Sequence, residues 1–353
     1  MPLQQNVSLQ PYNTFGIVAN ARWFGSFGSL NELQETFYGQ PITTENYPLI
    51  LGGGSNILLT KNIDGLVLKN EIFGIEKIHE TNDHVFIKAG AGVNWHQFVL
   101  HCIENNWAGV ENLSLIPGCV GASPMQNIGA YGVEIKDVFD QLEAWHLQDK
   151  TVVNFGLEDC AFGYRESVFK RKYKGQFVIL NVTYKLCKTP NFNTSYGAIN
   201  QELEKMGMQQ PTIKNISDAV INIRNSKLPD PKVIGNAGSF FKNPEIPLEK
   251  FEKLKAVFDG IVGYHLPNGH VKLAAGWLIE QSGPEITGTS PEITGTSWKG
   301  YRVGDAGVHA KQALVLVNYG NTSGLEIFKL SGNIMASVKM KFGVELEREV
   351  NIL

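Results

Sequence analysis

A glycine-rich turn in the first sixth of the chain has a spacing suited to binding an anion. Gly52, Gly53, Gly54, Ser55 and Asn56 lie between two short apolar runs, which gives the pattern strand, turn, strand. Three glycines let successive backbone N–H groups converge on one oxyanion without obstruction by side chains. The turn has neither G-x-G-x-x-G nor a following Gly-Lys-Ser/Thr, so it is not a common nucleotide fingerprint. A tight hairpin explains it about as well.

The stretch 115–132, LIPGCVGASPMQNIGAYG, combines four glycines and two prolines with almost no charge. Glycine and proline interrupt helices and strands, yet the stretch is too apolar for a solvated linker. We interpret it as a long ordered loop whose backbone N–H groups lie against a flat or anionic group, such as a bound cofactor. A buried crossover between domains is the alternative, and composition alone does not decide between the two.

An arginine and a serine stand in two further punctuated segments. Arg165 lies among aromatic residues in FGYRES at 162–167, which suits either an anion clamp or an arginine stacked on Tyr164. Ser239 follows two glycines in GNAGSFFKNP at 235–244, which superficially resembles a nucleophile elbow. G-x-S-x-G would need glycine where Phe241 stands, so this serine suits proton exchange or hydrogen bonding better than attack on a carbonyl.

The C-terminal segment 344–350, VELEREV, alternates apolar and acidic residues. As a strand, it would place three glutamates on one face and three apolar residues on the other. A solvated sheet edge is the simplest explanation for such carboxylates, unless one of them points into a cleft. The glutamates are Glu345, Glu347 and Glu349.

Composition describes an ordinary globular chain. Its 353 residues suggest two or three domains, and 43% hydrophobic with 18% charged residues argues against disorder. A formal net charge of −3 leaves no broad nucleic-acid footprint. No signal peptide and no apolar run of membrane-spanning length is found, so we expect a cytoplasmic protein that binds no membrane. The four cysteines are far apart and suggest free thiols and no metal site; they are Cys102, Cys119, Cys160 and Cys187.

Periodicity predicts mixed helices and strands, with the main domain boundary between about residues 196 and 217. A capping box at Ser29 begins a helix that ends at Gly39, and Asn94 begins another, in which His96 and His101 are expected at the surface. The heptapeptide PEITGTS at 284–290 is repeated at 291–297 and suggests a lengthened surface loop. Strands are expected at 48–51, 57–59, 66–68, 73–78, 85–89, 138–147, 151–155, 177–184 and 313–317. Further helices are expected after a cap at Ser217, at 248–258, at 273–281 and from 323 to 342.

Taken in order, these segments resemble the UDP-N-acetylenolpyruvoylglucosamine reductase (MurB) family, in the branch that retains a tyrosine loop. The resemblance extends from residue 13 to residue 349, and six motifs in order leave little room for coincidence. The motifs are GGGSN at 52–56, IPGCVGASPMQNIGAYG at 116–132, FGYRES at 162–167, KLPDPK at 227–232, GNAGSFFKNP at 235–244 and KLAAGWLIEQ at 272–281. The main departure is the doubled PEITGTS, where the family has a shorter or different loop.

The resemblance implies an α+β fold: a two-part FAD-binding region of the vanillyl-alcohol-oxidase (PCMH) type and a C-terminal α+β substrate domain. The implied boundaries are 1–66, 67–212 and 213–353, with the last strand free to pack back on the FAD region. It also implies the reaction. NADPH reduces FAD and leaves; the enolpyruvyl sugar nucleotide then accepts hydride from flavin N5 at C3 and a proton at C2, which yields UDP-N-acetylmuramate for peptidoglycan synthesis.

Three catalytic residues are carried over from the family pattern. Arg165 would neutralise the enolate-like charge that develops beside the substrate carboxylate, a contribution of about 3 kcal/mol for one preorganised donor. Glu349 would help to polarise that carboxylate, most usefully if it is protonated or shares a proton. Ser239 would supply the proton to C2, a general-acid step of roughly 10²–10⁴ in rate.

The resemblance also implies the binding residues. Tyr196 and Lys227 would hold the diphosphate and uridine portion of the substrate, and Asn243 and Gln312 would make further polar contacts. The FAD-binding residues would come from the turn at 52–56 and the loop at 115–132, with the turn cradling the pyrophosphate. From the loop they are Pro117, Gly118, Ser123, Pro124, Gln126, Asn127, Gly129, Ala130 and Tyr131.

Two alternatives stay open. The chain could be another FAD oxidoreductase of the same superfamily that acts on a different alcohol or sugar, or a flavin- or nucleotide-binding module without catalysis. The expected partners are small molecules, the sugar nucleotide and NADPH, with no protein partner indicated. The sequence does not give the oligomeric state.

Overall fold

The computed structural model describes residues 2–37, 47–195, 197–284 and 296–353. The chain divides into two compact units. Unit 1 comprises residues 1–7, 20–54 and 63–226, and unit 2 comprises 8–19, 55–62 and 227–353. The GGGSN turn therefore contributes its glycines to unit 1 and its last two residues to unit 2. The three-part division into 1–66, 67–212 and 213–353 stays a prediction.

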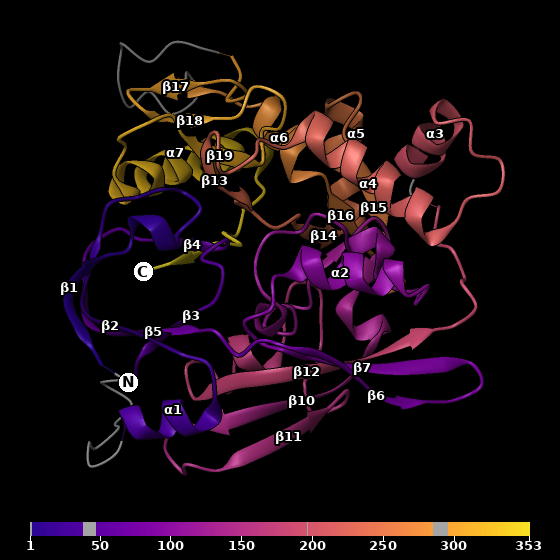
Figure 1. Cartoon of the computed structure of the whole chain (residues 1–353). Coiled ribbons are helices and arrows are strands. Elements are labelled where there is room, and N and C mark those ends of the chain that lie inside the picture. The colour runs from indigo at the N-terminus through magenta and orange to yellow at the C-terminus, as the bar shows by residue number, and fades with distance from the viewer. Residues whose placement is uncertain (1, 38–46, 196, 285–295) are drawn as a thin grey trace. The chain divides into compact units, whose positions relative to one another are not determined.

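Unit 1 begins with a four-stranded sheet in the order β1-β2-β5-β3, labelled in Figure 1. The pairs β2–β5 and β3–β5 are parallel. The helix α1 starts as expected, because the Ser29 hydroxyl accepts a hydrogen bond from the Glu32 N–H at 3.2 Å; its expected end at Gly39 lies outside the described residues. The elements are β1 (Gln4–Ser8), β2 (Asn20–Phe27), α1 (Leu30–Thr36), β3 (Leu49–Leu51) and β5 (Ile63–Asn70).

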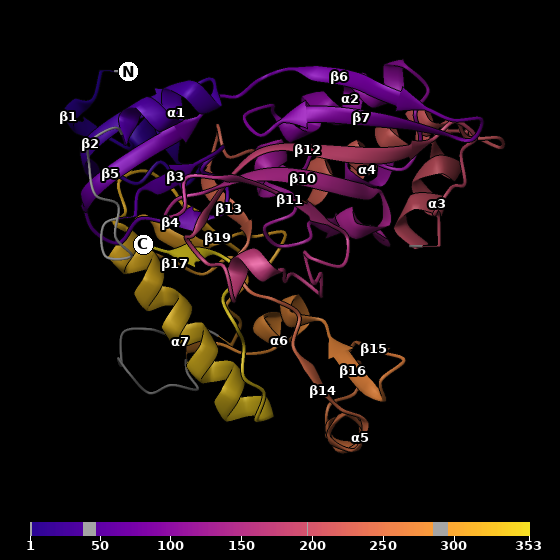
Figure 2. The ribbon, with the colours of Figure 1, turned by 90° about the horizontal axis from the view of Figure 1, so that it is seen from below.

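A second sheet of unit 1, in the order β11-β10-β12-β7-β6, is antiparallel throughout. Figure 2 shows these long strands side by side. The predicted apolar stripe of α2 is confirmed, because Trp95, Phe98, Val99, Cys102 and Ile103 are buried in the core on this sheet. The elements are β6 (Ile75–Glu80), β7 (His84–Gly90), α2 (Trp95–Glu104), β10 (Phe139–His146), β11 (Val152–Gly156) and β12 (Phe177–Cys187).

The polar region after β12 is more helical than expected. The interval 196–217, in which the main domain boundary was predicted, holds α3 (Gly197–Lys205), and α4 (Ile213–Lys227) begins four residues before the predicted cap. Ser217 is not a cap: it is buried inside α4, with its hydroxyl 2.7 Å from the Ser114 hydroxyl. The apolar faces of α3 and α4 form a small core of their own, made by Ile199, Leu203, Ile216, Ala219, Val220 and Ile223.

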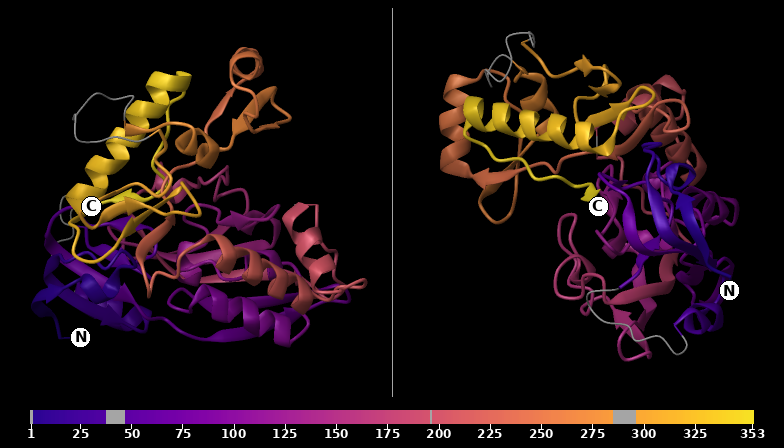
Figure 3. Two further views of the ribbon diagram at one scale, coloured as in Figure 1. Left: turned by 90° about the horizontal axis from the view of Figure 1, so that it is seen from above. Right: turned by 90° about the vertical axis from the view of Figure 1, so that its left-hand side faces the viewer.

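Unit 2 contains a four-stranded sheet in the order β13-β19-β18-β17, a three-stranded sheet in the order β14-β16-β15, and the parallel pair β4–β20. The long helix α7 lies against β18 and β19 and is yellow in both views of Figure 3. The elements are β4 (Ile57–Leu58), β13 (Gly235–Ser239), β14 (Glu245–Pro247), α5 (Leu248–Val257), β15 (Gly263–His265), β16 (His270–Leu273), α6 (Ala275–Glu280), β17 (Arg302–Val303), β18 (Ala306–Val308), β19 (Val315–Asn318), α7 (Gly324–Phe342) and β20 (Asn351–Ile352).

The capping signals of α7 are confirmed at both ends. The Ser323 hydroxyl accepts from the Glu326 N–H at 3.3 Å, and the Glu326 carboxylate accepts from the Ser323 N–H at 2.7 Å. Gly343 ends the helix with φ of 62°, a left-handed conformation that glycine adopts without strain. The predicted strand at 344–350 is wrong as a strand. Its alternation is nevertheless present, since Val344, Leu346 and Val350 are buried while Glu345 and Glu347 are exposed.

The remaining described elements are short. The duplicated heptapeptide falls largely outside the described residues. Within the described residues, no helix combines the length and apolarity that a membrane crossing requires. Short elements are η1 (Gln10–Tyr12), η2 (Glu111–Leu113), η3 (Val120–Ala122), β8 (Gly129–Ala130), β9 (Val133–Glu134), η4 (Ile135–Asp137) and η5 (Val168–Lys170).

Candidate functional site

The glycine turn of unit 1 is packed directly against the long loop. A Cβ built on Gly53 would lie 2.8 Å from the Cα of Gly118, which is closer than real Cβ atoms approach a main chain. The hairpin alternative is wrong, because β3 pairs with β5 and β4 pairs with β20, and the two flanking strands do not pair with each other. The glycine turn and the long loop, both predicted to hold the same ligand, therefore contact each other at Gly53 and Gly118. A side chain at Gly53 would fill the cradle between them.

The loop at 115–132 is ordered by hydrogen bonds from neighbouring elements. The Trp95 N–H donates to the Gly118 carbonyl at 3.0 Å, and the Gly121 N–H donates to the Ala91 carbonyl at 2.9 Å. At the start of the loop, the Leu115 N–H donates to Nδ1 of His96 at 3.0 Å. The surface prediction for His96 is therefore wrong: its ring is half-buried and holds the loop backbone.

Several loop residues have backbone conformations that only a specific packing supports. Leu115, Asn127 and Tyr131 have φ of 59°, 45° and 51°, in the left-handed region that side chains rarely adopt. Strain of this kind is concentrated at ligand-binding segments, where surrounding contacts maintain it. Pro117 and Gly118 precede η3, Pro124 and Gln126 follow it, and Gly129 and Ala130 form β8.

Two predicted FAD-binding residues use their side chains inside the protein. The buried Ser123 hydroxyl lies 2.7 Å from the Tyr184 hydroxyl. The buried Asn127 amide donates to Glu134 Oε2 and to the Gly163 carbonyl, both at 3.0 Å. These two side chains therefore help to hold the loop in place, and their proposed contacts with the cofactor stay predictions.

Arg165 joins the same loop from the FGYRES motif. One guanidinium N–H donates to the Gly129 carbonyl at 2.7 Å, and the guanidinium carbon lies 5.4 Å from the centre of the Tyr164 ring. The stacked interpretation is thus present, but the arginine also contacts the loop. Gly129 has no room for a side chain, since a Cβ there would lie 3.1 Å from Nη1 of Arg165 and 2.9 Å from the Val133 carbonyl oxygen. This arrangement presents a cation at the loop surface.

In unit 2, Ser239 and Glu349 lie in two segments that run antiparallel. The Glu349 N–H donates to the Phe240 carbonyl at 2.8 Å, and the Lys242 N–H donates to the Glu347 carbonyl at 2.9 Å. Ser239 is exposed at the end of β13 and Glu349 is half-buried. Ser239, the predicted proton donor, therefore directly precedes Phe240, whose carbonyl accepts the N–H of Glu349.

Two side chains that the sequence analysis missed hold these segments. The Lys242 ammonium lies 2.7 Å from Glu347 Oε1, and its side chain is only 9% exposed. Nε of Arg348 donates to the Ser331 hydroxyl of α7 at 2.8 Å, and its guanidinium carbon lies 4.3 Å from the Phe328 ring centre. The signal available in the sequence was that Lys242 lies within the motif GNAGSFFKNP and that Arg348 directly precedes Glu349.

Predicted substrate residues Asn243 and Gln312 converge on the start of α6. Asn243 Oδ1 accepts from the Ala275 N–H at 3.0 Å, and a Cβ on Gly276 would lie 3.0 Å from Gln312 Oε1. Lys227 is exposed at the last position of α4. Tyr196 lies outside the described residues.

The remaining half of the glycine turn belongs to unit 2 with the terminal segment. Nδ2 of Asn56 donates to the Glu349 carbonyl at 3.4 Å, and the Asn351 N–H donates to the Asn56 carbonyl at 3.0 Å. Ser55 lies beside Asn56 at the boundary of the two units. Unit 1 thus holds the glycines, the loop and Arg165, and unit 2 holds Asn56, Ser239, Asn243, Gln312 and Glu349.

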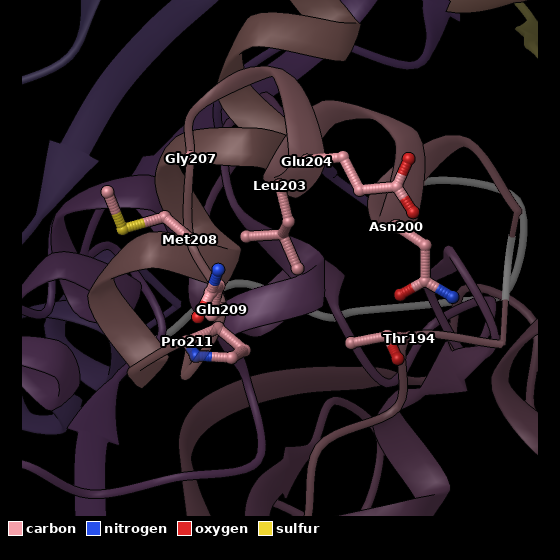
Figure 4. A pocket seen from close by; sticks show the side chains of 8 residues that line it. All are labelled: Thr194, Asn200, Leu203, Glu204, Gly207, Met208, Gln209 and Pro211. Carbon is pink, nitrogen blue, oxygen red and sulfur yellow. The ribbon is translucent and has the colours of Figure 1, made fainter.

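Unit 1 also has an open depression of about 640 Å³. Figure 4 shows its lining, which includes Leu203 and Glu204 of α3. Of the predicted site residues that the structure describes, none lines it. No group of His, Cys, Asp or Glu that could hold a metal ion is found in the described part of the chain.

Comparison with known protein families shows which class of protein the chain belongs to. Residues 43–156, which include the glycine turn and the long loop, match the model of the FAD binding domain family. The chain is therefore a flavoprotein, and the glycine cradle between the turn and the loop fits an anionic cofactor bound through backbone N–H groups. Residues 230–353 match the model of the UDP-N-acetylenolpyruvoylglucosamine reductase C-terminal domain.

The chain belongs to the UDP-N-acetylenolpyruvoylglucosamine reductase family, the NADPH- and FAD-dependent oxidoreductases of peptidoglycan precursor synthesis. It is 50% identical over 353 residues to the enzyme of Amoebophilus asiaticus, with all of both chains covered. It is 48% identical over 357 residues to that of Flavobacterium johnsoniae, again with complete coverage of both.

A solved structure shows the same fold. The crystal structure of the reductase from Thermus caldophilus aligns with a TM-score of 0.66 at 21% identity, covering 100% of this chain and 99% of that one. The predicted fold class, an FAD-binding region of the PCMH type followed by an α+β C-terminal domain, is confirmed.

Proposed function

We propose that the chain reduces UDP-N-acetylglucosamine enolpyruvate to UDP-N-acetylmuramate in two half-reactions at one site. NADPH binds and leaves before the sugar nucleotide enters. The bound flavin supplies hydride to C3 of the enolpyruvyl group. This proposal rests on the family of the chain together with the residues assigned below, and it locates the reaction in the cytoplasm, where NADPH is available.

Arg165 is proposed to neutralise the charge that develops when C3 receives hydride. The negative charge is shared by C2 and the adjacent carboxylate, so a guanidinium held against the loop can stabilise it without rearranging. The hydrogen bond from Arg165 to the Gly129 carbonyl and the cation–π contact with Tyr164 support a fixed guanidinium. Glu349 is proposed to polarise the same carboxylate.

Ser239 is proposed to give its hydroxyl proton to C2. A serine is a weak acid, but a carbanion-like carbon is a strong base, so the transfer needs geometry more than a shifted pKa. The single observation that carries the proposal is the pairing of Phe240 with Glu349, at 2.8 Å, which puts the serine and the glutamate on adjoining segments of one unit.

Substrate binding is proposed for Lys227, Tyr196, Asn243 and Gln312. Lys227 would act as a point charge on the diphosphate. Tyr196 would contribute from the loop around residues 193–197, and the chain would thereby belong to the tyrosine-loop branch of the family. The convergence of Asn243 and Gln312 on the start of α6 supports a common role for these two.

The proposal is tested by anaerobic stopped-flow absorbance of the FAD-loaded protein. Addition of NADPH should bleach the flavin, and subsequent addition of the enolpyruvyl nucleotide should restore its absorbance. Absence of recovery would reject the second half-reaction and favour a binding module. Turnover with oxygen on an alcohol, and none on the nucleotide, would instead indicate a different oxidoreductase of the superfamily.

The role of Ser239 is tested by S239A in the same experiment. Bleaching by NADPH should stay nearly unchanged, while recovery should slow by roughly 10²–10⁴. S8A, which changes another exposed serine of unit 2, is the matched control and should leave both phases intact. Equal loss of both phases in S239A would show that the serine is structural.

A further inference from the structure

Arg224, in the last turn of α4, has surroundings unlike those of the other arginines of unit 1. Its Nε is buried and has no hydrogen-bond partner among the residues that the structure describes. Its guanidinium is hydrogen-bonded to Tyr131, the residue with φ of 51° near the end of the long loop. By contrast, Arg22 pairs with Asp64 at 3.2 Å on the surface.

Among the residues that the structure describes, no carboxylate forms an ion pair with Arg224. Burial lowers the pKa of its guanidinium, and Tyr131 opposes that effect. Arg224 is half-buried as a residue, but its Nε is shielded from water. A partly desolvated cation without a counter-charge is costly, and proteins normally pair it or place it against an anionic ligand. The missing negative charge is therefore a feature to be explained.

The neighbouring imidazole of His96 can be neutral or cationic, so it is no counter-ion for Arg224. Burial, and after it the charge of Arg224, lower the pKa of His96, which favours the neutral ring. A neutral ring agrees with the geometry, since Nδ1 accepts the Leu115 N–H at 3.0 Å and has no proton of its own. Arg224 is thus hydrogen-bonded to Tyr131 of the loop, and its charge acts on His96 of α2.

We propose that Arg224, together with Tyr131, forms an anion site that takes a phosphate oxygen of a nucleotide ligand. An Nε and a terminal N–H of one guanidinium form a planar fork that matches two oxygens of a phosphate. The inference rests on the proposed function in one respect, namely that the ligands of this enzyme are nucleotide diphosphates.

Two sources can supply the same phosphate chemistry. Tyr131 belongs to the loop proposed to bind FAD, so the flavin diphosphate is one source. Lys227, proposed for the sugar nucleotide, follows Arg224 by three residues in α4, a spacing that puts two residues on one helix face. The diphosphate of the sugar nucleotide is therefore the other.

The test compares R224M, which keeps the apolar stem, with R224K, which keeps the charge and loses the fork. R22M is the matched control, because Arg22 is an exposed arginine of the same unit. FAD binding is measured by fluorescence quenching on protein stripped of flavin. UDP binding is measured by calorimetry on the FAD-loaded protein.

We expect R224M to weaken binding of at least one of the two probes by tenfold or more, R224K to restore part of the loss, and R22M to change neither by more than twofold. Loss confined to FAD assigns the flavin diphosphate, and loss confined to UDP assigns the sugar nucleotide. Unchanged affinity of R224M and R224K for both probes would overturn the inference.

Folding and catalysis are separated from binding by two further measurements. The His96 ring is followed by NMR; in a folded R224M its pKa should rise when the neighbouring positive charge is removed. If R224M does not fold, R224K decides, because it must then bind one probe at least threefold more weakly than R22M. Failure of the wild-type protein to reduce the enolpyruvyl nucleotide would overturn the proposed function and leave these affinities standing.

Discussion

G53A tests whether the contact between the glycine turn and the long loop makes the flavin site. The new Cβ would lie 2.8 Å from Gly118 Cα and 3.2 Å from Gly118 C, whereas carbon atoms in contact lie about 3.5–4.0 Å apart. The opposing atoms are backbone, so no side chain can rotate away. The turn or the loop must move by several tenths of an ångström or more, and the N–H groups proposed to meet the pyrophosphate move with it.

Overpacking of this kind costs about 1–3 kcal/mol. If the cost falls on the FAD-bound arrangement, FAD affinity drops by roughly 5–150-fold, since about 1.4 kcal/mol corresponds to a factor of ten. The assay is fluorescence titration of flavin-free protein with FAD, alongside thermal unfolding with and without FAD. The expected result is weak FAD binding by a chain that still unfolds cooperatively.

G65A is the matched control, because Gly65 lies in β5 of the same unit and a Cβ there meets no atom within 4 Å. It should bind FAD as the wild type does. A folded G53A protein whose FAD affinity stays within twofold of the wild-type value would refute the reasoning, since the crowding would then have no consequence for the cofactor.

Three further predictions concern residues that hold the proposed site in place. K242M should lower the free energy of unfolding by about 1 kcal/mol. This is the value of a charge-assisted hydrogen bond, reduced because its partner Glu347 is exposed to solvent. A double-mutant cycle with E347Q should show that the two single losses arise from the same interaction. R348K loses the guanidinium contacts to α7 and should slow flavin recovery about tenfold while NADPH bleaching is unchanged; equal slowing of both phases would contradict a positioning role. The pKa of His96 is lowered in the folded protein, so the unfolded chain binds more protons at this residue. The stability that His96 contributes is therefore complete above its ordinary pKa of about 6.5. That contribution declines as the pH falls toward the pKa of the folded state. H96Q should flatten the dependence of the unfolding midpoint on pH as the pH falls below about 6.5; an unchanged slope would show that another group is responsible.

Elements with local signals were predictable from the sequence. The helix α7 has Ser323 and Glu326 at its start and Gly343 at its end, and α2 has an apolar stripe that repeats at helical spacing. Such signals act over a few residues, so one segment contains all the information. The glycine turn was identified for the same reason, because Gly53 lies in a run of three consecutive glycines.

Elements defined by distant partners were not predictable. Ser217 was predicted to be a helix cap because serine is favoured at that position. In the structure it is buried within α4, and its hydroxyl pairs with that of Ser114, about a hundred positions earlier in the chain. His96 was assigned to the surface because it lies off the apolar stripe, and only the fold brings the Leu115 N–H to it. Local preference gave way to tertiary contact in both cases.

The segment around Glu349 shows how the two kinds of information combine. Alternation in the sequence correctly separated the buried Val344, Leu346 and Val350 from the exposed Glu345 and Glu347, because that pattern depends only on an extended backbone. The chemistry of Glu349 depends on something else: its N–H bonds the residue after Ser239, and its carbonyl accepts from Asn56. One sequence motif, GGGSN, therefore has two structural tasks. Its glycines form the cradle against the loop, and its asparagine holds the backbone of the proposed catalytic glutamate.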